Sequence, residues 1–454
     1  MLLCMVLSVL TLEHVSEAGA FIYKVGHFEA PWGNELRIGY LESIMSIVFT
    51  SIAALIIWAS FYSVEHEIKE KNIKLYYTLC GILLASLLGI VYSNDIFNCF
   101  VFIEISSISA CGIVVVKDKK ENIKAAIKYL ILSSLGSGLV LMGIAFLYSI
   151  TGNLNIDYIY KELSGVKDLY HNTLIISLGL FTVGLGVKSA MFPLHVWLPD
   201  AHTYAPSSSS AMLSSLVLKA YIILYIKVIY RMFGIETVKE LPVLELVLIM
   251  GAAGMIFGSI MALLQKDLKR MIAYSSVAQI GYIFFGIGLG NTLGLIAAVF
   301  HIISHALTKA ALFLVAGSII ERVHSKEISS LKGIGIEMPV TLGIFIVCAL
   351  SMVGIPLFIG FNSKWNFALA IIDSNRILFI AVLIASSLLN ALYYLPIIIN
   401  AFFGEENTGG MVYRSKEKPI RALIPVMLLA FAIIYFGVSS KGIIDLIAKS
   451  VSGL

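Results

Sequence analysis

The sequence predicts an all-α, polytopic membrane protein. Hydrophobic residues make up 59% of the 454 residues and charged residues only 13%, with a mean hydropathy of +0.93. A soluble domain carries about 25% charged residues, so this composition excludes that class. Apolar stretches of roughly 20 residues, enough for a helix to cross a bilayer, recur along the whole chain. The net charge of +4 says little about partners, and we expect no nucleic-acid partner.

About thirteen transmembrane helices are predicted. The first is segment 1–12, which is short for a span but is counted as one crossing. The other twelve cover residues 40–62, 74–93, 95–116, 124–150, 172–197, 207–231, 241–264, 270–289, 292–320, 338–372, 376–403 and 420–438. Three connecting segments complete the chain: a polar connector at 13–39 that can form a hairpin, an interfacial helix at 156–168 and a tail at 441–451.

The first residues have two further interpretations. An apolar segment followed by Ala18, Gly19 and Ala20 resembles a secretory signal peptide, although it lacks a basic n-region. A truncated or misassigned start explains the shortness of segment 1–12 equally well.

Two of the predicted spans contain helix-breaking residues. Pro193 interrupts 172–197, and Gly354 and Pro356 interrupt 338–372. Such breaks within a membrane remove helix hydrogen bonds, and they are tolerated only where protein or water satisfies the freed backbone groups. We therefore expect both breaks to line a polar path inside the protein.

The broken helices also indicate an internal repeat. Each is the fourth span in a block of five, 74–231 and 241–403, and each carries a lysine near its break. Because five is odd, two such blocks enter the membrane from opposite faces, as in inverted repeats. We expect each block to form one half-channel. Residues 1–73 precede the blocks as N-terminal helices and a connector, and residues 404–454 follow them as a C-terminal helix and tail.

Lysine and arginine residues predict the orientation. Loops on the side of the N-terminus hold 18 of them, whereas the opposite loops together with the C-terminal tail hold 9. Positively charged loops stay on the cytoplasmic side. The N-terminus is therefore predicted inside and the C-terminus outside, in a multi-pass protein of the cell membrane.

The first block contains three charged residues in apolar helices: Glu104, Lys188 and Lys219. A lysine at mid-membrane depth costs about 2.5–3.5 kcal/mol. A glutamate–lysine pair that can separate is a switchable proton-binding element, because the carboxylate changes the proton affinity of the lysine. The alternatives are a structural helix–helix hydrogen bond for Glu104 and snorkelling for Lys188. Snorkelling explains Lys219 poorly, since it lies far from either end of its span.

The second block contains His301, His305 and Lys309 at spacings that place them on one helix face. Histidine titrates near neutral pH and can relay protons. A haem needs two histidines that face each other from different helices, and a metal would need further ligands, so no cofactor or metal is expected. Lys364 follows the second break, and we predict that it matches Lys188 in the repeat.

Several polar residues extend this set. Residues Asn390, Tyr393 and Tyr394 can continue a polar path towards one face. The loop after the first break holds three candidate gate residues, which can also act as helix caps: His195, Asp200 and His202. The serines at 207–210 follow Pro206 and predict a helix start.

Other chemistry is not indicated. The five cysteines are scattered in apolar stretches without CxxC or metal-ligand spacing, which is typical of packing residues. Neither a Walker loop nor a GxGxxG motif after a strand is present, so nucleotide binding by this chain is not expected.

Four runs of the sequence resemble a known family: VKSAMFPLHVWLPDAHTYAPSSSSAML, LVLKA, DLKRMIAYSSVAQIGY and HIISHALTKAALFLVAGSI. They are similar to the antiporter-like subunits of respiratory complex I (NADH-quinone oxidoreductase), of Mrp-type multisubunit Na+/H+ antiporters and of membrane-bound hydrogenases. The resemblance covers roughly residues 25–440. The opening segment GHFEAPWGNELRIGYLESIM is most similar to the Mrp D-type and hydrogenase-type branch.

The resemblance implies a fold of fourteen helices with two inverted five-helix repeats, each containing a broken helix. The thirteen spans here would be the second to the fourteenth. It also implies that Glu104 pairs with Lys188 and that Lys219 bridges the half-channels. In the second half, the resemblance implies that His301 and His305 line a relay beside Lys309 and that Lys364 is the terminal titratable residue. Some branches have glutamate at that last position.

The predicted function is ion translocation within a larger complex. The partners implied are antiporter-like and small membrane subunits, a peripheral redox arm, the lipid bilayer, and H+ or Na+; the subunits of this family hold no redox cofactor. One alternative is a cation/proton antiporter subunit without a redox partner. A solute symporter is a further alternative, which requires a cavity at the membrane midplane. No redox or hydrolytic site is recognised in the chain, so whether it belongs to an enzyme stays open.

Overall fold

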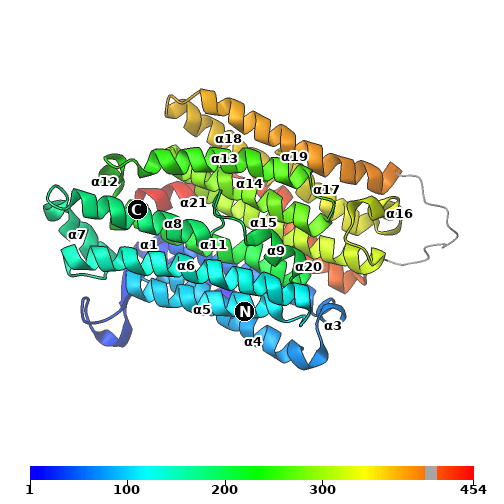
Figure 1. Cartoon of the computed structure of the whole chain (residues 1–454), viewed down its shortest axis with the longest axis horizontal. Helices are drawn as coiled ribbons and strands as arrows, with labels where there is room; N and C mark the ends of the chain where they lie inside the picture. The colour runs from blue at the N-terminus through cyan, green and yellow to red at the C-terminus, as the bar shows by residue number, and fades with distance from the viewer. Residues whose placement is uncertain (404–416) are drawn as a thin grey trace.

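The computed structural model describes residues 1–403 and 417–454, and Figure 1 shows helices packed side by side along one axis. Ten of the described helices are long and apolar enough to cross a membrane. They are α2 (Tyr40–Ser60), α4 (Glu70–Tyr92), α5 (Ile96–Val115), α6 (Lys120–Thr151), the continuous segment from α10 to η3 (Ser207–Met232), α13 (Val243–Leu263), α14 (Leu268–Gly288), α15 (Thr292–Val323), α19 (Leu378–Phe403) and α20 (Ile420–Val438). The prediction of a polytopic helical membrane fold is confirmed.

Both predicted helix breaks are present. The first separates α8 (His171–Lys188) from α9 (Leu198–Tyr204), and the second separates α17 (Pro339–Val353) from α18 (Ile359–Asp373). Helix α17 ends at Gly354, whose φ of 90° lies in the left-handed region that glycine adopts without a side-chain clash. The proline and glycine signals therefore located both interruptions correctly.

One long central helix changes its winding twice. It begins at Ser207 directly after Pro206, as predicted, and runs through α10 (Ser207–Met212) and α11 (Leu218–Ile226). Two π-helical segments, η2 (Leu213–Val217) and η3 (Lys227–Met232), follow these two α-helical parts. Single π turns inside α-helices are frequent at functional sites.

The N-terminal region differs from its prediction at one point. Helix α1 covers Leu2–Ala18, so the polar connector predicted to start at residue 13 was placed too early; the helix ends only at Gly19, which has a φ of 82°. The predicted hairpin is present as strands β1 (Phe21–Lys24) and β2 (Glu35–Ile38), which pair antiparallel around the short η1 (Val25–His27). The N-terminus lies between the two ends of the bundle in Figure 1.

Short helices cover the two ends of the bundle. The left end of Figure 1 holds α7 (Ile156–Val166), α12 (Ile235–Lys239) and the C-terminal α21 (Lys441–Ser452). The right end holds α3 (Val64–Glu67) and α16 (Ile334–Glu337), and η4 (Ile328–Leu331) shortly precedes α16 in the chain. Helix α7 matches the helix predicted at 156–168, and the predicted tail is helical. The start of the predicted C-terminal segment 404–454 falls on residues 404–416, which lie outside the described part.

Three helices form the centre of the bundle. In α14, α15 and the segment Ser207–Met232, the whole of the most apolar stretch is buried, whereas the other seven candidate spans bury 28–61% of theirs. A helix can bury every face only when other helices surround it. The residues predicted to move ions through the middle of the chain, Lys219 and His301 to Lys309, lie on these central helices.

Helices α6 and α8 approach closely through two glycines. A Cβ atom on Gly184 of α8 would lie 2.7 Å from the carbonyl oxygen of Gly136 on α6. Small residues allow such close backbone contact between membrane helices. This contact holds the end of α8, and with it Lys188, against the neighbouring helix.

Candidate functional site

The first predicted pair lies where α5 faces the end of α8. Lys188 is the last residue of α8, and its ammonium nitrogen is 3.7 Å from Oε1 of Glu104. The same nitrogen donates hydrogen bonds to the hydroxyls of Ser107 and Ser133, at 2.6 and 2.8 Å. The lysine is therefore held at the break by two hydroxyls, with the carboxylate as its counter-charge.

Glu104 is less buried than expected. Its side chain is 36% exposed, whereas that of Lys188 is 1% exposed. The side chain is only partly buried because α5 buries less than half of its most apolar stretch inside the bundle. Part of the Glu104 side chain is thus exposed, whereas Oε1, which faces Lys188, is buried.

Lys219 lies in the centre and has no carboxylate within ion-pair distance in the part of the chain that the structure describes. Its side chain is fully buried, and its ammonium group donates to the carbonyl oxygen of Ser214, on the π-helical segment η2 of the same helix. The altered winding therefore places a backbone acceptor next to this fully buried lysine.

The three titratable residues of α15 lie on one face, as the spacing predicted. The rings of His301 and His305 stack with centroids 6.1 Å apart. His301 shares a hydrogen bond of 2.7 Å between Nδ1 and the hydroxyl of Ser363 on α18. Both ring nitrogens of His305 lack a hydrogen-bond partner among the described residues, and the charges of Lys219 and Lys309 act on this ring. The charges of lysines from both halves thus act on the histidine stripe.

Lys309 connects α15 to two other helices. Its ammonium group donates to the carbonyl of Ile272 at 2.9 Å and to the hydroxyl of Ser275, both on α14. The hydroxyl of Ser275 is 3.0 Å from that of Tyr394 on α19. A chain of hydrogen bonds therefore leads from Lys309 into α19.

Helix α19 continues this chain towards the second break. The Tyr393 hydroxyl donates to Asn390 at 2.6 Å, and the Asn390 amide donates to the carbonyl of Met352 at 3.2 Å. Lys364 donates to the same carbonyl at 3.0 Å. The rings of Tyr393 and Tyr394 are 4.7 Å apart. Polar side chains therefore lie between Lys309 and Lys364, with a ring contact joining Tyr394 to Tyr393. The sequence predicted only that these residues extend a path towards one face.

Lys364 does not occupy the same place in its broken helix as Lys188. Lys188 ends the helix before the first break, whereas Lys364 lies inside α18, after the second break. Its ammonium group donates to the carbonyls of Met352 and Val353, the end of α17, and to the hydroxyl of Ser387. The expected positional match was wrong, because Lys364 reaches back across the break and caps the preceding half-helix.

Lys219, Lys309 and Lys364 share an unusual chemical setting. Each is nine-tenths or more buried, each bonds to carbonyl or hydroxyl oxygens, and none lies within ion-pair distance of a carboxylate among the described residues. An amine donates to such oxygens whether or not it carries the extra proton. Charge in such surroundings is costly. These sites are suited to holding a proton for a time rather than a fixed positive charge.

The three candidate gate residues lie in different surroundings. Asp200 pairs with Lys128 at 2.6 Å and lies 3.5 Å from Arg270, which ties α9 to two helices. His202 is fully buried against Phe313, with neither ring nitrogen paired in the described part of the chain. His195 stacks on the ring of Phe192 at 5.5 Å. Asp200 therefore has a structural pairing, whereas His202 faces the interior.

A charged cluster that the sequence interpretation missed lies at the end of the bundle marked by α3. The carboxylate of Glu67 accepts from the backbone N–H of Ser207, at the start of α10, and pairs with Lys117. The buried Lys269 donates to the carbonyl of Ala205 at 2.6 Å. Burial alone would raise the pKa of Glu67, but the charges of Lys117 and Lys269 hold it below its usual value. This cluster fixes the turn between α9 and α10.

A second missed cluster lies at the opposite end of the same central helix. Glu42 is 3% exposed, and its Oε1 lies 3.8 Å from Lys227 and 3.5 Å from Arg231. Arg231 also donates to Asp157 and to Asn94, each at 2.8 Å. Burial would raise the pKa of Asp157, but the Arg231 guanidinium lowers it below its usual value. The signal in the sequence was the spacing of Lys227 and Arg231, which follow Lys219 by eight and twelve residues.

Metal ligands do not gather in the described residues. Nowhere in residues 1–403 and 417–454 do three His, Cys, Asp or Glu side chains come together as a metal site would need. The cysteines of this part are free and lie apart. The expected absence of a cofactor stays a prediction.

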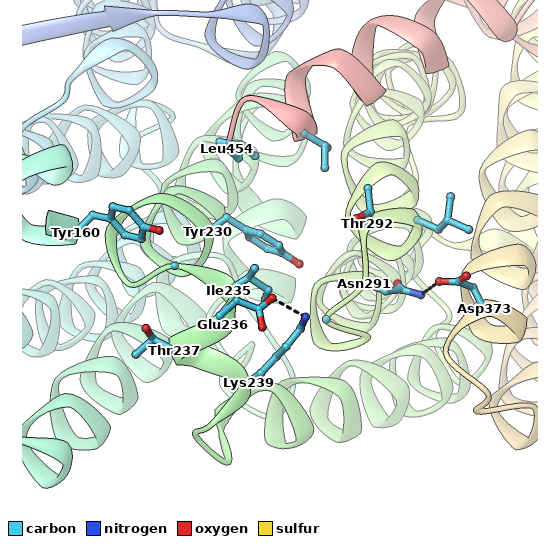
Figure 2. Close-up of a pocket in the computed structure, with 14 residues that line it drawn as sticks. Tyr160, Tyr230, Ile235, Glu236, Thr237, Lys239, Asn291, Thr292, Asp373 and Leu454 are labelled. Atoms are coloured by element: carbon cyan, nitrogen blue, oxygen red, sulfur yellow. Dashed lines mark hydrogen bonds and ion pairs between the residues drawn. The ribbon is translucent and has the colours of Figure 1, made fainter. Parts of the chain in front are cut away.

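A large surface cavity lies away from the buried lysines. Figure 2 shows this cavity of about 650 Å3, lined by Tyr160 and Tyr230 on one side and by Asn291, Thr292 and Asp373 on the other. Ion pairs and hydrogen bonds close two parts of its wall, between Glu236 and Lys239 and between Asn291 and Asp373. It lies at the end of the bundle that holds α12 rather than at mid-depth, so it does not supply the midplane cavity that a solute symporter needs.

Taken together, the fold and these residues define a class: a polytopic helical membrane protein whose centre carries a series of buried lysines and histidines between two broken helices. Comparison with known proteins agrees with that class. The family model described as "NADH:quinone oxidoreductase/Mrp antiporter, TM" matches residues 93–390, and the chain belongs to this family.

Relatives of two kinds are similar over nearly the whole chain. NADH-quinone oxidoreductase subunit N of Desulforudis audaxviator is 36% identical over 436 residues, which cover 93% of this chain and 85% of the relative. The D-type component of the Na(+)/H(+) antiporter of Alkalihalophilus pseudofirmus is 28% identical over 429 residues, covering 94% and 85%. The chain is thus more similar in sequence to this oxidoreductase subunit than to this antiporter subunit. The comparison of these two relatives therefore does not support a particular similarity to the D-type branch.

Two solved structures share the fold. One is the membrane-bound sulfane sulfur reductase, an archaeal respiratory membrane complex; its matching chain has a TM-score of 0.90 and 30% identity, with coverage of 99% of this chain and 90% of that one. The other is the Mrp complex of a Dietzia species, with a TM-score of 0.91, 22% identity and the same coverage. Both relatives in these structures are parts of multisubunit membrane complexes.

Proposed function

We propose that this chain translocates protons, or Na+ in exchange for protons, as one subunit of a multisubunit membrane complex. The observation that carries the proposal is the series of buried titratable groups through the centre of the fold, from the Glu104–Lys188 pair to Lys364. Buried lysines in a membrane protein are costly and mark ion pathways. The family supports the same function, since its named members include quinone oxidoreductase and antiporter subunits.

The first step takes place at the Glu104–Lys188 pair. The carboxylate favours the charged form of the lysine, and the serine hydroxyls hold the amine when the carboxylate moves away. Because Glu104 is at the edge of the bundle, a charge on a neighbouring subunit can compete for it. A change in this pairing alters the proton affinity of Lys188 and passes a charge signal towards Lys219.

The later steps follow the central helices. The charges of Lys219 and Lys309 both act on the His305 ring. This ring accepts and donates a proton through its two nitrogens, which have no hydrogen-bond partner among the described residues. From Lys309 the hydroxyls of Ser275 and Tyr394 lead to α19, and from there polar groups lead to Lys364. We assign release of the ion to Lys364. We assign a gating role to His202, on which the charges of Lys269, Lys309 and Lys219 act.

We infer that the chain crosses the membrane thirteen times. The ten candidate spans are joined by α1 and by the two broken helices, α8 with α9 and α17 with α18. Residues 74–231 and 241–403 are the two inverted half-channels, flanked by 1–73 and 404–454. The positive-inside distribution supports an inside N-terminus and an outside C-terminus in the cell membrane.

Two kinds of complex remain candidates, because the relatives include subunits of both. A redox-driven complex would supply its quinone or ferredoxin chemistry from other subunits, and an antiporter complex would use an ion gradient alone. Purification of the complex with identification of its partners separates them: iron–sulfur subunits indicate the first, and only small membrane proteins indicate the second.

The proposal is tested by Lys219→Ala in the assembled complex, reconstituted in proteoliposomes with its own driving reaction or an imposed Na+ gradient. Lys167→Ala, which removes a surface lysine paired with Glu240, is the matched control. We expect the Lys219 variant to assemble but to lose ion translocation, and the control to translocate normally. Unchanged translocation by the Lys219 variant would show that the central lysines do not carry the ion.

A further inference from the structure

A buried charge cluster at the end of the bundle marked by α7 and α21 is not part of the path from Lys188 to Lys364. It centres on Glu42, the third residue of α2, which is 3% exposed. One carboxylate oxygen, Oε2, accepts from the backbone N–H of Gly39 at 3.2 Å. The other, Oε1, has no hydrogen-bond partner among the described residues. A buried carboxylate oxygen left without a donor is costly, so its presence calls for a reason.

Lys227 faces this oxygen from the helix that carries Lys219. Its ammonium group is fully buried, 3.8 Å from Oε1 of Glu42. It donates to the carbonyls of Val91, Ile90 and Ser93, at the end of α4, the last two at 3.4 and 3.2 Å. These oxygens accept from both protonation forms of a lysine. Glu42 and Lys227 thus repeat the arrangement of Glu104 and Lys188: a carboxylate near a lysine that is held by other oxygens.

A small opening reaches the same carboxylate from the surface. A cavity of about 40 Å3 lies between the start of α2 and the end of α21, and its lining includes Arg37, Glu42, Lys449 and Ser450. A water molecule needs about 10–15 Å3 of such space. The site is polar enough to hold water, because the Glu42 carboxylate, the Arg37 guanidinium and the backbone at Gly453 meet there. Water can therefore stand between the surface and Glu42.

Helix α21 forms one wall of this opening. Arg37 donates to the carbonyl of Gly453 at 3.0 Å, and the Lys449 ammonium lies over the Tyr40 ring at 6.0 Å from its centroid. Both contacts join the C-terminal helix to the start of α2. The two cations flank the opening, and their charges oppose the entry of a metal cation.

We propose that this opening is a proton port on the outer side of the membrane and that Glu42 is the group that exchanges protons there. Glu42 takes up or releases a proton through the water in the opening, and its charge governs the contact with Lys227 and Arg231. Both cations lie on the π-helical segment η3, in the same continuous helix as Lys219. The port thereby connects the helix that carries Lys219 to the outer medium. This inference rests on the proposed translocation function and on the outside location of the C-terminus.

Accessibility of the port is tested without any ion flux. Ser450→Cys replaces a buried hydroxyl in the wall of the opening by a thiol, and Ser86→Cys places a thiol at an equally buried serine of α4 away from it. Cys4 and Cys111, which are not fully buried, are changed to alanine in both. We expect a membrane-impermeant thiol reagent added from the outer side to label Ser450→Cys in intact vesicles and to leave Ser86→Cys unlabelled. Equal labelling of the two, or labelling of Ser450→Cys only from the inner side, overturns the port.

Its role in translocation is tested in the same assembled complex. We expect Glu42→Gln to lose most proton translocation and Glu42→Asp, which keeps the carboxylate, to retain it, since a positioned proton-transfer group contributes about 100-fold or more. Blocking Ser450→Cys with a bulky impermeant reagent should cause the same loss in a chain that has already folded. Full translocation after complete blocking overturns the proposal. If Lys219→Ala loses translocation but a complex with a blocked port translocates normally, the port is refuted and the proposed function is kept. If Lys219→Ala translocates normally, the proposed function itself is refuted.

Discussion

Tyr394 provides the sharpest test of the link between Lys309 and Lys364. Its ring is fully buried, and its hydroxyl is 3.0 Å from that of Ser275, which Lys309 contacts. Tyr394→Phe removes only this hydroxyl and leaves the packing of the ring. A buried polar group that loses its partner costs about 1–3 kcal/mol. If that cost is added to the barrier for proton transfer, translocation slows by about 5- to 150-fold, since each 1.36 kcal/mol is tenfold.

Tyr225→Phe is the matched control for that prediction. Tyr225 is also fully buried, and its hydroxyl lies 3.1 Å from that of Thr182, away from the proposed path. Both variants lose one hydroxyl–hydroxyl bond, so both should lose similar stability in thermal denaturation of the solubilised complex. Translocation and the driving reaction are then measured together in proteoliposomes. Equal translocation by the two variants would refute the route through Ser275 and Tyr394.

Two further predictions concern the elements that hold the path in place. Glu67→Gln should lower the free energy of unfolding by about 1–3 kcal/mol at neutral pH. Because the pKa of Glu67 is lowered in the folded state, the stability difference between the variant and the parent should shrink as pH falls through that pKa. Thermal denaturation at a series of acidic pH values checks this. A constant difference at every pH would contradict the pairing with Lys117. Gly184→Ala should destabilise by about 1–3 kcal/mol, because its Cβ would meet the backbone of Gly136. Gly138→Ala on α6, where nothing lies within 4 Å, should not destabilise, and equal unfolding temperatures for the two variants would show that α6 and α8 do not pack this closely.

The parts of the fold that the sequence predicted well are those with a strong local cause. Proline and glycine inside apolar spans located both breaks, because they remove helix hydrogen bonds wherever they stand. The spacing of His301, His305 and Lys309 placed them on one face, since helical periodicity alone decides that. The serine run after Pro206 located the start of α10 in the same way.

The polar route to Lys364 could not be predicted in its actual course. Ser275 and Tyr394 lie on different helices, and neither residue type signals an ion path by itself. Their contact depends on how α14 packs against α15 and α19, which no local pattern encodes. The position of Lys364 was misjudged for a related reason: both lysines lie near a break, but only the folded chain shows on which side of the break each one stands.

The cluster around Glu42 had a partial signal. Lys227 and Arg231 are four residues apart and therefore share one helix face. An arginine and a lysine near the end of an apolar helix also suit an ordinary interface position. Glu42 in the first turn of α2 has the usual place of a helix-capping acid. Their pairing depends on the packing of α2 against the central helix, which no local sequence pattern encodes.

The central claim is that both halves of the chain form one continuous ion path. It is tested most directly by measuring translocation per turnover of the driving reaction with Lys188→Ala and with Lys364→Ala, each in a fully assembled complex. A single path predicts that either replacement abolishes translocation, although the other half is intact. If each variant instead retained about half of the translocation of the parent complex, the two halves would conduct independently and the account would be contradicted.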